Sequence, residues 1–498
     1  MSELIFEGKR TDLAELWQRA QVLAVELAEG HRVGPGANVL LTLEFSDAAL
    51  ELLAASWLLQ ARCVLLPPTC SRALFESVVA QFAPAAIGID SRNERLRSGL
   101  ERDSMTVGDA DGGHVVVYTA EGTGAAGEAV VPSSPPASLR TLLEDQPQPV
   151  FFTSGSTSQA KGVVLEWPRI LDKGEAVLEH YRVADDERVV PILPFSHVYG
   201  LYPVLGALAR GASCVLCRET VPPGEIAQAI SRERASVVIC PPLTAQFLFG
   251  RHAPSAVVQE NLRVLSLGGA AMAADVLEQI RQNLPQTQLY LSYGLAETYS
   301  TICCVDVSAE PERVSTVGPA RFLAEVQARD PNSGHPVPRG EIGELCIGGQ
   351  ITSGYYGAEH DRQTYFAADG WLRTGDLGCV DEQGYVSIRG RLKETINAGG
   401  LSIDPSEIEE VVLAHPSVQD CGVVGAERMN REYPVAAVVL DAAATDGADE
   451  ATAIEELFAH CRRQLSAKLV PGKIVVVAEI PRGALGKIER ATLKNQIV

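Results

Sequence analysis

A short loop rich in glycine and hydroxyl side chains is the segment of this chain whose residues point most clearly to chemistry. It spans residues 151–162, follows an apolar strand and presents Lys161 near its end. Gly155 allows a tight turn, so that successive N–H groups can converge on anionic oxygens beside the lysine charge. Hydroxyl donors are added by Thr153, Ser154, Ser156 and Thr157. The loop predicts phosphate binding, although its spacing differs from the P-loop pattern and a solvated surface loop is the alternative.

Further motifs follow this loop in a fixed order and extend almost to the C-terminus. They are Leu193–His197, Leu267–Ala270, Tyr293–Glu297, Gly343–Leu345, Arg373–Leu377, Gly390–Glu394 and Pro481–Lys487. With these motifs the chain resembles the adenylate-forming superfamily of acyl- and aryl-CoA synthetases, luciferases and peptide-synthetase adenylation domains. The resemblance implies a ligase that joins ATP and a carboxylic acid into an acyl-adenylate and then transfers the acyl group to a thiol.

The resemblance also implies an ATP or AMP site. Asp376 would accept hydrogen bonds from the ribose hydroxyls, and Arg391 would assist at the ribose or the phosphates. The adenine would lie against small residues that allow close backbone approach and against one aromatic ring: Gly268, Gly269, Ala270 and Tyr293. Glu297 would hold the Mg²⁺ that bridges the phosphates, because this hard cation prefers carboxylate oxygen.

Three further residues are given a role by the resemblance. Lys487 would contact both the carboxylate and the α-phosphate, where a cation stabilises charge that develops during adenylation. Lys393 matches the hinge about which the C-terminal domain rotates between the two half-reactions. His197 would stand at the carboxylate pocket, between the acyl site and the thiol tunnel. On local grounds alone, each of them reads as an ordinary surface or structural side chain.

The fourth residue of the Tyr293–Glu297 motif departs from the common pattern. Ala296 stands where threonine is frequent, so one hydroxyl contact to the nucleotide is missing, and Thr298 is a candidate to replace it. A catalytically inactive relative that binds nucleotide or acyl ligand is therefore the alternative function. Luciferase-type oxidation of the adenylate uses the same scaffold and stays open.

The sequence narrows the class of acid substrate but leaves the thiol acceptor open. Amino-acid-activating relatives usually carry an aspartate after the phenylalanine that Phe195 matches, but here Ser196 follows it. We therefore expect an aryl or fatty acid without an α-amino group. The thiol is coenzyme A or the phosphopantetheine arm of an acyl carrier protein. Residues 462–494 carry a net charge of +6, which suits an acidic carrier and the coenzyme A phosphates equally.

Composition excludes other classes of protein. The formal net charge of −21 argues against a nucleic-acid partner, which calls for a basic surface. The N-terminus lacks the apolar core of a signal peptide, and we expect no membrane span and a cytoplasmic protein. The 11 cysteines are scattered through apolar runs, which is typical of buried free thiols in a reducing compartment. Cys214 and Cys217 form one Cys-x2-Cys without a second pair, so we expect no zinc site.

The order of apolar segments predicts an α/β protein. Helical periodicity at 12–29 and 46–59 alternates with strand candidates at 38–44, 62–66, 149–153, 189–193, 213–217, 236–240 and 263–267, as in parallel βαβ sheets. Short strands after residue 310 indicate a small β subdomain. We expect an N-terminal AMP-binding domain over 1–390 and a mobile α+β C-terminal domain over 391–498, with an amphipathic helix at 455–469.

Overall fold

The computed structural model describes residues 2–98, 100, 103–107, 115–119, 131–132, 134, 136–153, 161–193, 195–218, 221–250, 261–270, 272, 274–357, 362–392, 394, 396–397, 402–428, 431–441, 450–466, 469–482 and 487–498. Within these residues, every helix is too short or too polar to span a bilayer. The chain forms two compact units. Unit 1 comprises Met1–Ala324 and Gly349–Arg362, and unit 2 comprises Glu325–Gly348 and Gln363–Val498.

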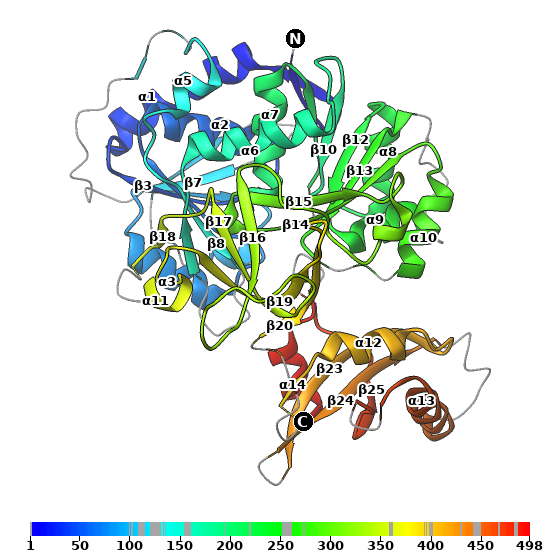
Figure 1. The fold of residues 1–498 in the computed structure, drawn as a ribbon. Helices are drawn as coiled ribbons and strands as arrows, with labels where there is room; N and C mark the ends of the chain where they lie inside the picture. The colour runs from blue at the N-terminus through cyan, green and yellow to red at the C-terminus, as the bar shows by residue number, and fades with distance from the viewer. Residues whose placement is uncertain are drawn as a thin grey trace. The chain divides into compact units, whose positions relative to one another are not determined.

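Unit 1 contains two eight-stranded sheets (Figure 1). The first has the order β15-β14-β13-β12-β10-β11-β1-β2, in which the strands from β14 to β1 pair in parallel and the edge strands β15 and β2 are antiparallel. Its strands are β1 (Glu3–Phe6), β2 (Lys9–Asp12), β10 (Arg188–Pro191), β11 (Ser213–Leu216), β12 (Val237–Cys240), β13 (Val264–Gly268), β14 (Gln288–Leu295) and β15 (Ser300–Asp306). All residues of β12 and β13 are buried, so both faces of this sheet are covered.

The second sheet of unit 1 has the order β18-β9-β8-β4-β3-β5-β7-β6. Its centre, β8-β4-β3-β5, is parallel, and antiparallel strands flank it on both sides. The strands are β3 (Asn38–Thr42), β4 (Arg62–Leu65), β5 (Ala86–Asp90), β6 (Asp103–Val107), β7 (Val115–Thr119), β8 (Val150–Thr153), β9 (Lys161–Val164) and β18 (Gly354–Tyr355). This sheet carries the two strands on either side of the glycine- and hydroxyl-rich loop.

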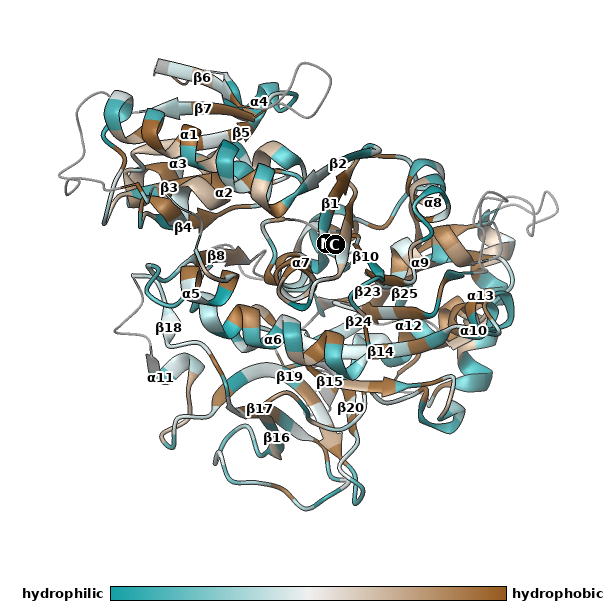
Figure 2. Cartoon of the chain, turned by 90° about the horizontal axis from the view of Figure 1, so that it is seen from above, coloured by the Kyte–Doolittle hydropathy of each residue, from teal (hydrophilic) through white to brown (hydrophobic). Residues whose placement is uncertain are grey.

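Helices connect and cover these strands. They are α1 (Leu13–His31), α2 (Asp47–Leu58), α3 (Arg72–Phe82), α4 (Glu94–Arg97), α5 (Leu139–Leu143), α6 (Trp167–His180), α7 (Val198–Arg210), α8 (Pro223–Arg232), α9 (Pro242–Phe249) and α10 (Ala274–Asn283), with the 3₁₀ turns η2 (Ala296–Thr298) and η3 (Pro311–Arg313). The side chains of Asp12 and Ser46 accept backbone N–H groups at the starts of α1 and α2. In Figure 2, α7 is hydrophobic along most of its length, which agrees with its burial.

Two glycines set the close packing of α6 against α7. A Cβ atom on Gly174 would lie 2.3 Å from the Tyr202 carbonyl oxygen, and one on Gly206 would lie 2.4 Å from the Gly174 carbonyl carbon. Side chains at these positions would force the helices apart. The glycine pair therefore fixes the position of α7, whose first residue follows His197.

Unit 2 contains a four-stranded sheet of order β16-β17-β19-β20, a two-stranded sheet β21-β22 and a three-stranded sheet β23-β24-β25. The strands are β16 (Ala324–Arg329), β17 (Gly343–Gly349), β19 (Leu372–Val380), β20 (Val386–Arg391), β21 (Ile396–Asn397), β22 (Ser402–Ile403), β23 (Val418–Arg428), β24 (Arg431–Leu440) and β25 (Lys473–Val476). The helices are α11 (Arg362–Tyr365), α12 (Pro405–Leu413), α13 (Glu450–Gln464) and α14 (Arg490–Ile497). Buried residues of α12 and α13 pack in one core with β23 and β24, and those of α14 pack in another.

The predicted α/β class is confirmed, with a small antiparallel sheet and a small α+β region after the large sheets. The expectation of largely parallel sheets holds for their centres, because antiparallel strands close both edges of each large sheet. The helix predicted at 455–469 is present but begins earlier and ends earlier, at Glu450 and Gln464. The domain boundary at residue 390 stays a prediction.

Candidate active site

The glycine- and hydroxyl-rich loop is closed by a β-hairpin. β8 and β9 pair in antiparallel fashion, with Thr153 opposite Lys161 at the mouth of the loop. Ser154, Gly155, Ser156 and Thr157, predicted to bind phosphate, lie outside the described residues. The hairpin register nevertheless places the two ends of the loop, and with them Lys161, at the same end of the sheet.

Lys161 and Glu297 meet through one tyrosine. The Lys161 Nζ atom lies 5.5 Å from the ring centroid of Tyr355, within cation–π range, and the Tyr355 hydroxyl donates a 2.7 Å hydrogen bond to Glu297 Oε1. Tyr355 is held there because β18 pairs with β9, opposite Val163. A 2.6 Å bond from the Thr352 N–H to the Glu297 carbonyl joins the same segments. The structure thus brings together a cation and a carboxylate that are far apart in the sequence.

The turn that carries Glu297 uses Thr298 for its own structure. The single proton of the Thr298 hydroxyl lies between two acceptors, the carbonyls of Leu295 and Ser300 at 3.0 and 2.8 Å from Oγ1, and Oγ1 accepts the Leu295 N–H at 3.1 Å. Thr298 is fully buried. The idea that its hydroxyl replaces the one missing at Ala296 is therefore wrong for this conformation, since these backbone groups already occupy it.

The segment predicted to contact adenine begins at the carboxyl end of β13. A Cβ atom on Gly268 would lie 2.4 Å from Ser292 Oγ and 2.6 Å from the Tyr199 hydroxyl, so only glycine fits. Gly269 has φ of +89°, a left-handed conformation that favours glycine, and partly exposed Ala270 follows it. Tyr293, on the neighbouring strand β14, is 9% exposed. Little of its ring is open to a stacked base in this conformation.

His197 lies directly before α7, near the carboxyl end of β13. It is the N-cap residue of this helix and is half-buried. Tyr199, in the first turn, has its hydroxyl against Gly268, and burial raises the pKa of that phenol. Phe195 packs edge-on against Phe45, with ring centroids 5.5 Å apart. These contacts fix the backbone on both sides of the histidine and bring it to the same end of the first sheet as Gly268.

In unit 2, Asp376 and Arg391, which were each predicted to bind the nucleotide, form an ion pair. They lie opposite each other on β19 and β20, and Arg391 Nε is 3.0 Å from Asp376 Oδ1. Asp376 is 4% exposed, so its carboxylate needs partners of this kind. Gly375 before it has φ of +72°, and the Leu392 N–H donates to the Gly375 carbonyl at 2.8 Å.

A buried glutamate shapes the turn before Asp376. Glu344 accepts from Arg373 Nε at 3.0 Å and Nη2 at 2.8 Å, and its other oxygen accepts the Gly375 N–H at 3.1 Å. The hydrogen bond and charge of Glu344 raise the pKa of the Arg373 guanidinium. Thr374 donates to the Leu345 carbonyl at 2.6 Å and accepts the Asp376 N–H at 2.9 Å. Two motifs that sequence reasoning treated separately therefore form one hydrogen-bonded network.

Lys487 is exposed and lies three residues before Arg490, the first residue of α14. The segment before it is closed by the bridge between Arg482 and Ile488 and by a 2.8 Å bond from the Glu489 N–H to the Pro481 carbonyl. The predicted hinge residue Lys393 lies outside the described residues. Lys487, Asp376 and Arg391 belong to unit 2, whereas Lys161, His197 and Glu297 belong to unit 1.

Elsewhere, the described residues form no metal cluster, and they line a surface pocket that contains no motif residue. Among the described residues, no group of three or more histidine, cysteine, aspartate or glutamate side chains could hold a metal ion. A surface pocket of about 440 Å³ lies at the amino end of β14, opposite the end that leads to Glu297. Its lining residues are Glu179, His180, Arg182, Gln288, Tyr290 and Asp306.

Comparison with known proteins identifies the family. The AMP-binding enzyme model matches residues 2–356, and the AMP-binding enzyme C-terminal domain model matches residues 407–487. The chain is 29% identical over 359 residues to a 4-coumarate–CoA ligase-like protein of Oryza sativa subsp. japonica, a match covering 71% of this chain and 63% of the rice protein. It is 27% identical over 496 residues to 2-succinylbenzoate–CoA ligase of Bacillus velezensis, covering 99% of this chain and 94% of the relative.

A solved structure extends the likeness over the whole fold. Amide bond synthetase McbA from Marinactinospora thermotolerans superposes with a TM-score of 0.81 at 26% identity, covering 99% of this chain and 96% of the other. The chain belongs to the AMP-binding enzyme family. It is an enzyme of the family that includes the AMP-forming acid–CoA ligases.

Sequence reasoning missed Tyr355, which contacts Lys161 and Glu297 in unit 1, and it missed the contact that Glu344 makes in unit 2. Tyr355 is marked only by the Gly354–Gly357 segment, in which two glycines flank two tyrosines, and that pattern alone does not pair it with β9. Glu344 was visible as part of a motif, but its contact with Arg373 follows from strand register.

Proposed function

We propose that this protein is an ATP-dependent carboxylic acid ligase that forms an acyl-adenylate and then an acyl thioester. The observation that carries the proposal is the contact series from Lys161 through Tyr355 to Glu297. It gives the phosphate loop a cation and a carboxylate at one place, although Glu297 stands more than a hundred residues after the loop.

In the first half-reaction, a carboxylate oxygen of the acid attacks the α-phosphorus of ATP, and the bond to pyrophosphate breaks. Lys161 and the loop N–H groups would bind the phosphates. Mg²⁺ typically uses one or two carboxylates and keeps its other positions for water and phosphate oxygen, so a single Glu297 fits such a site. A bound Mg²⁺ would neutralise part of the phosphate charge.

Lys487 would stabilise the charge that develops on the α-phosphate and would contact the acid carboxylate. Its exposure, next to the segment 483–486, suits a side chain that has to reach a substrate. Asp376 would accept hydrogen bonds from the ribose hydroxyls. Arg391, which is paired with the same carboxylate, would keep that carboxylate oriented. Gly268, Gly269, Ala270 and Tyr293 would adjoin the adenine, as the resemblance implies.

In the second half-reaction, a thiol sulfur attacks the acyl carbon, the thiol loses its proton and AMP leaves. The acceptor would be coenzyme A or the phosphopantetheine arm of a carrier protein. Rotation of the region after Lys393 would withdraw Lys487 between the steps. The comparison with an amide bond synthetase adds an amine as an acceptor that the assay should include.

The acid would be aryl or fatty rather than an amino acid. Ser196 is fully buried, and its short hydroxyl offers no charge to an α-ammonium group. His197, held at the start of α7, would stand at the carboxylate end of the acyl site. There it would lie between the acyl site and the thiol tunnel, as the resemblance implies.

The test is acid-dependent ATP–pyrophosphate exchange over a panel of aryl, fatty and amino acids. We expect exchange with at least one aryl or fatty acid, and thioester formation when coenzyme A or a loaded carrier protein is then added. Exchange with amino acids alone would contradict the acid assignment. Nucleotide binding without exchange for any acid would favour the inactive relative.

A further inference from the structure

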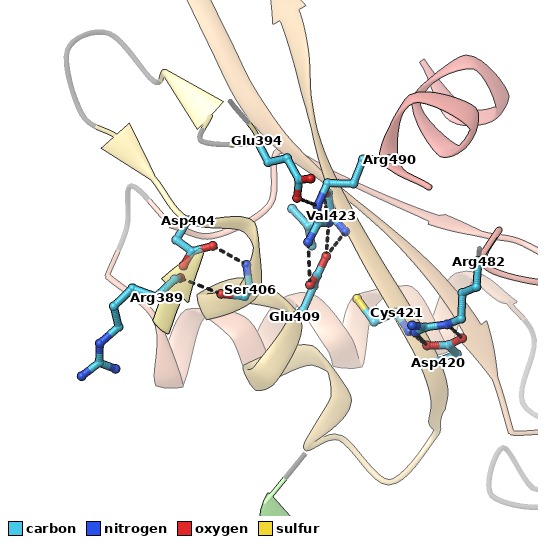
Figure 3. Close-up of polar contacts among 10 residues, drawn as sticks. All are labelled: Arg389, Glu394, Asp404, Ser406, Glu409, Asp420, Cys421, Val423, Arg482 and Arg490. Atoms are coloured by element: carbon cyan, nitrogen blue, oxygen red, sulfur yellow. Dashed lines mark hydrogen bonds and ion pairs between the residues drawn. The ribbon is translucent and has the colours of Figure 1, made fainter. Parts of the chain in front are cut away.

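Arg490 forms the most extensive polar contact of the C-terminal region. Its Nε donates to Glu394 Oε2 at 2.8 Å, Nη2 donates to Glu409 Oε2 at 3.1 Å, and Nη1 donates to Glu409 Oε1 and, at 2.7 Å, to the Val423 carbonyl (Figure 3). Burial would lower the pKa of Arg490, but the bonds to Glu409 and Glu394 raise it above its ordinary value. This guanidinium therefore joins three segments of the chain.

Each of these segments has a defined place. Glu394 is the residue directly after Lys393, Glu409 lies on α12, and Val423 lies in the middle of β23. Glu409 also accepts the Val423 N–H at 2.7 Å, so it is fixed independently of Arg490. Arg490 itself is the first residue of α14, three residues after Lys487.

The chain before Lys393 is fixed by different contacts. Arg391 pairs with Asp376 across β19 and β20, and the Leu392 N–H donates to Gly375. The chain after Glu394 is fixed by Ile396, which is 1% exposed in the core that also holds α12. In sequence, only Leu392 and Lys393 stand between Arg391 and Glu394, and the Glu394 N–H donates to the Arg391 carbonyl at 3.0 Å across them.

We propose that Arg490 is a positioning residue, which fixes the segment after Lys393 to the helix after Lys487, so that both move as one rigid body. This inference rests on the proposed function, in which the C-terminal region rotates and Lys487 acts in adenylation only. The rotation is then confined to Leu392 and Lys393. Each return to the adenylation orientation therefore brings Lys487 to the same position. Among the described residues, two hydrogen bonds join the two sides and would break on rotation: the Glu394 N–H donates to the Arg391 carbonyl at 3.0 Å, and Ser406 Oγ donates to the Arg389 carbonyl at 3.1 Å.

Glu394→Gln is the variant that isolates this role. It keeps the size of the side chain and leaves the Arg490–Glu409 contacts intact, so the C-terminal core is retained. We expect adenylation, measured as pyrophosphate exchange, to fall by about tenfold, as for loss of one charge-assisted hydrogen bond. Thioester formation from supplied acyl-adenylate should change by less than about twofold, because Lys487 takes no part in it. Amide hydrogen exchange in a peptide covering residues 391–397 should become faster.

Asp420→Asn is the matched control. It removes the carboxylate charge from the pair with Arg482, whose Nη2 is 2.6 Å from Asp420 Oδ1 (Figure 3). Arg482 precedes Lys487 in the sequence, whereas Arg490 follows it. This pair does not contact Glu394. Hydrogen exchange over 391–397 should therefore stay at the wild-type rate. Arg490→Lys keeps the charge but cannot make all the bonds, so it should repeat the Glu394→Gln pattern, with rates corrected for the folded fraction.

The outcomes are distinct. Equal losses in both half-reactions for Glu394→Gln, or equal exchange rates over 391–397 in Glu394→Gln and Asp420→Asn, overturn the positioning role. Absence of pyrophosphate exchange in the wild-type protein with every acid overturns the proposed function instead. In that case the hydrogen exchange of the two variants still decides whether Arg490 fixes the segment after Lys393.

Discussion

Replacing Glu344 by glutamine should weaken ATP binding without touching a predicted ligand of ATP. The Glu344 carboxylate is 4% exposed and accepts three hydrogen bonds, two from Arg373 and one from the Gly375 N–H. An amide can accept only through its oxygen, so its NH₂ group would face one of these donors. The turn that presents Asp376 would then have to shift.

The size of the expected rise in the KM for ATP follows from the hydrogen-bond donors that lose their acceptor. A buried donor that loses its acceptor costs about 1–3 kcal/mol. The Arg373 side chain is 34% exposed and can turn to water, so its share lies at the low end, and the Gly375 N–H accounts for most of the effect. If about 1.4 kcal/mol of this is expressed in the bound state, the KM for ATP rises about tenfold.

The assay is pyrophosphate exchange at saturating acid with ATP varied. We expect the KM for ATP to rise and kcat to stay within about threefold, because ribose contacts are made in the ground state and the transition state alike. Asp376→Ala, which removes the acceptor itself, should set the upper limit of the KM effect. Asp369→Asn is the control, since it breaks a pair with Arg329 that does not touch the turn. A lowered melting temperature with an unchanged KM for Glu344→Gln would refute the reasoning.

Three other changes test the role of Lys487, the hinge at Lys393 and the pH dependence of stability. Lys487→Ala should lower adenylation by at least ~10²-fold while sparing thioester formation from supplied acyl-adenylate, and equal losses in both steps would contradict its role. Lys393→Pro, which fixes φ and removes an N–H, should leave pyrophosphate exchange near normal and strongly reduce thioester production; intact overall turnover would place the hinge elsewhere. Burial lowers the pKa of Lys173 from 10.5 to about 8. Between these two pH values the unfolded chain binds more protons than the folded protein, so the free energy of unfolding should rise with pH, by up to about 3 kcal/mol. Lys173→Met should remove that rise, measured as the difference between the two denaturation curves, and a parallel pH dependence would show that Lys173 is not the group responsible.

The sequence predicted local elements better than it predicted contacts between them. Helices α1 and α2 and most strands of the parallel sheet centres were predicted because their periodicity and buried β-branched runs are local signals, whereas β1 and β5 were not among the strand candidates. Asp376 and Arg391 were both predicted to bind the nucleotide, and their pairing is consistent with that prediction. For α13, the amphipathic pattern gave the existence of the helix but not its ends, which depend on capping and tertiary packing.

The contacts that sequence reasoning missed all depend on register between distant strands. Tyr355 reaches Lys161 and Glu297 because two residues of β18 pair with β9, nearly two hundred residues earlier. A shift by one residue would turn its side chain to the other face of the sheet. Thr298 shows the converse: its type suggested a nucleotide contact, but a tight turn uses the hydroxyl first.

The order in which the chain visits the four-stranded sheet decides which fragments can be expressed. β16 and β17 come from residues 324–349, and β19 and β20 come from residues 372–391, with β18 of unit 1 between them. A fragment starting at Gln363 would carry β19 with its β17 edge bare, and such an edge pairs with other chains. A fragment ending at residue 356, where the first family match ends, would keep β16 and β17 but lose β19, which leaves the other edge of β17 bare. Separate production of the two halves should therefore give aggregation at either cut, whereas a start after β20 removes the sheet entirely and leaves the cores around α12, α13 and α14.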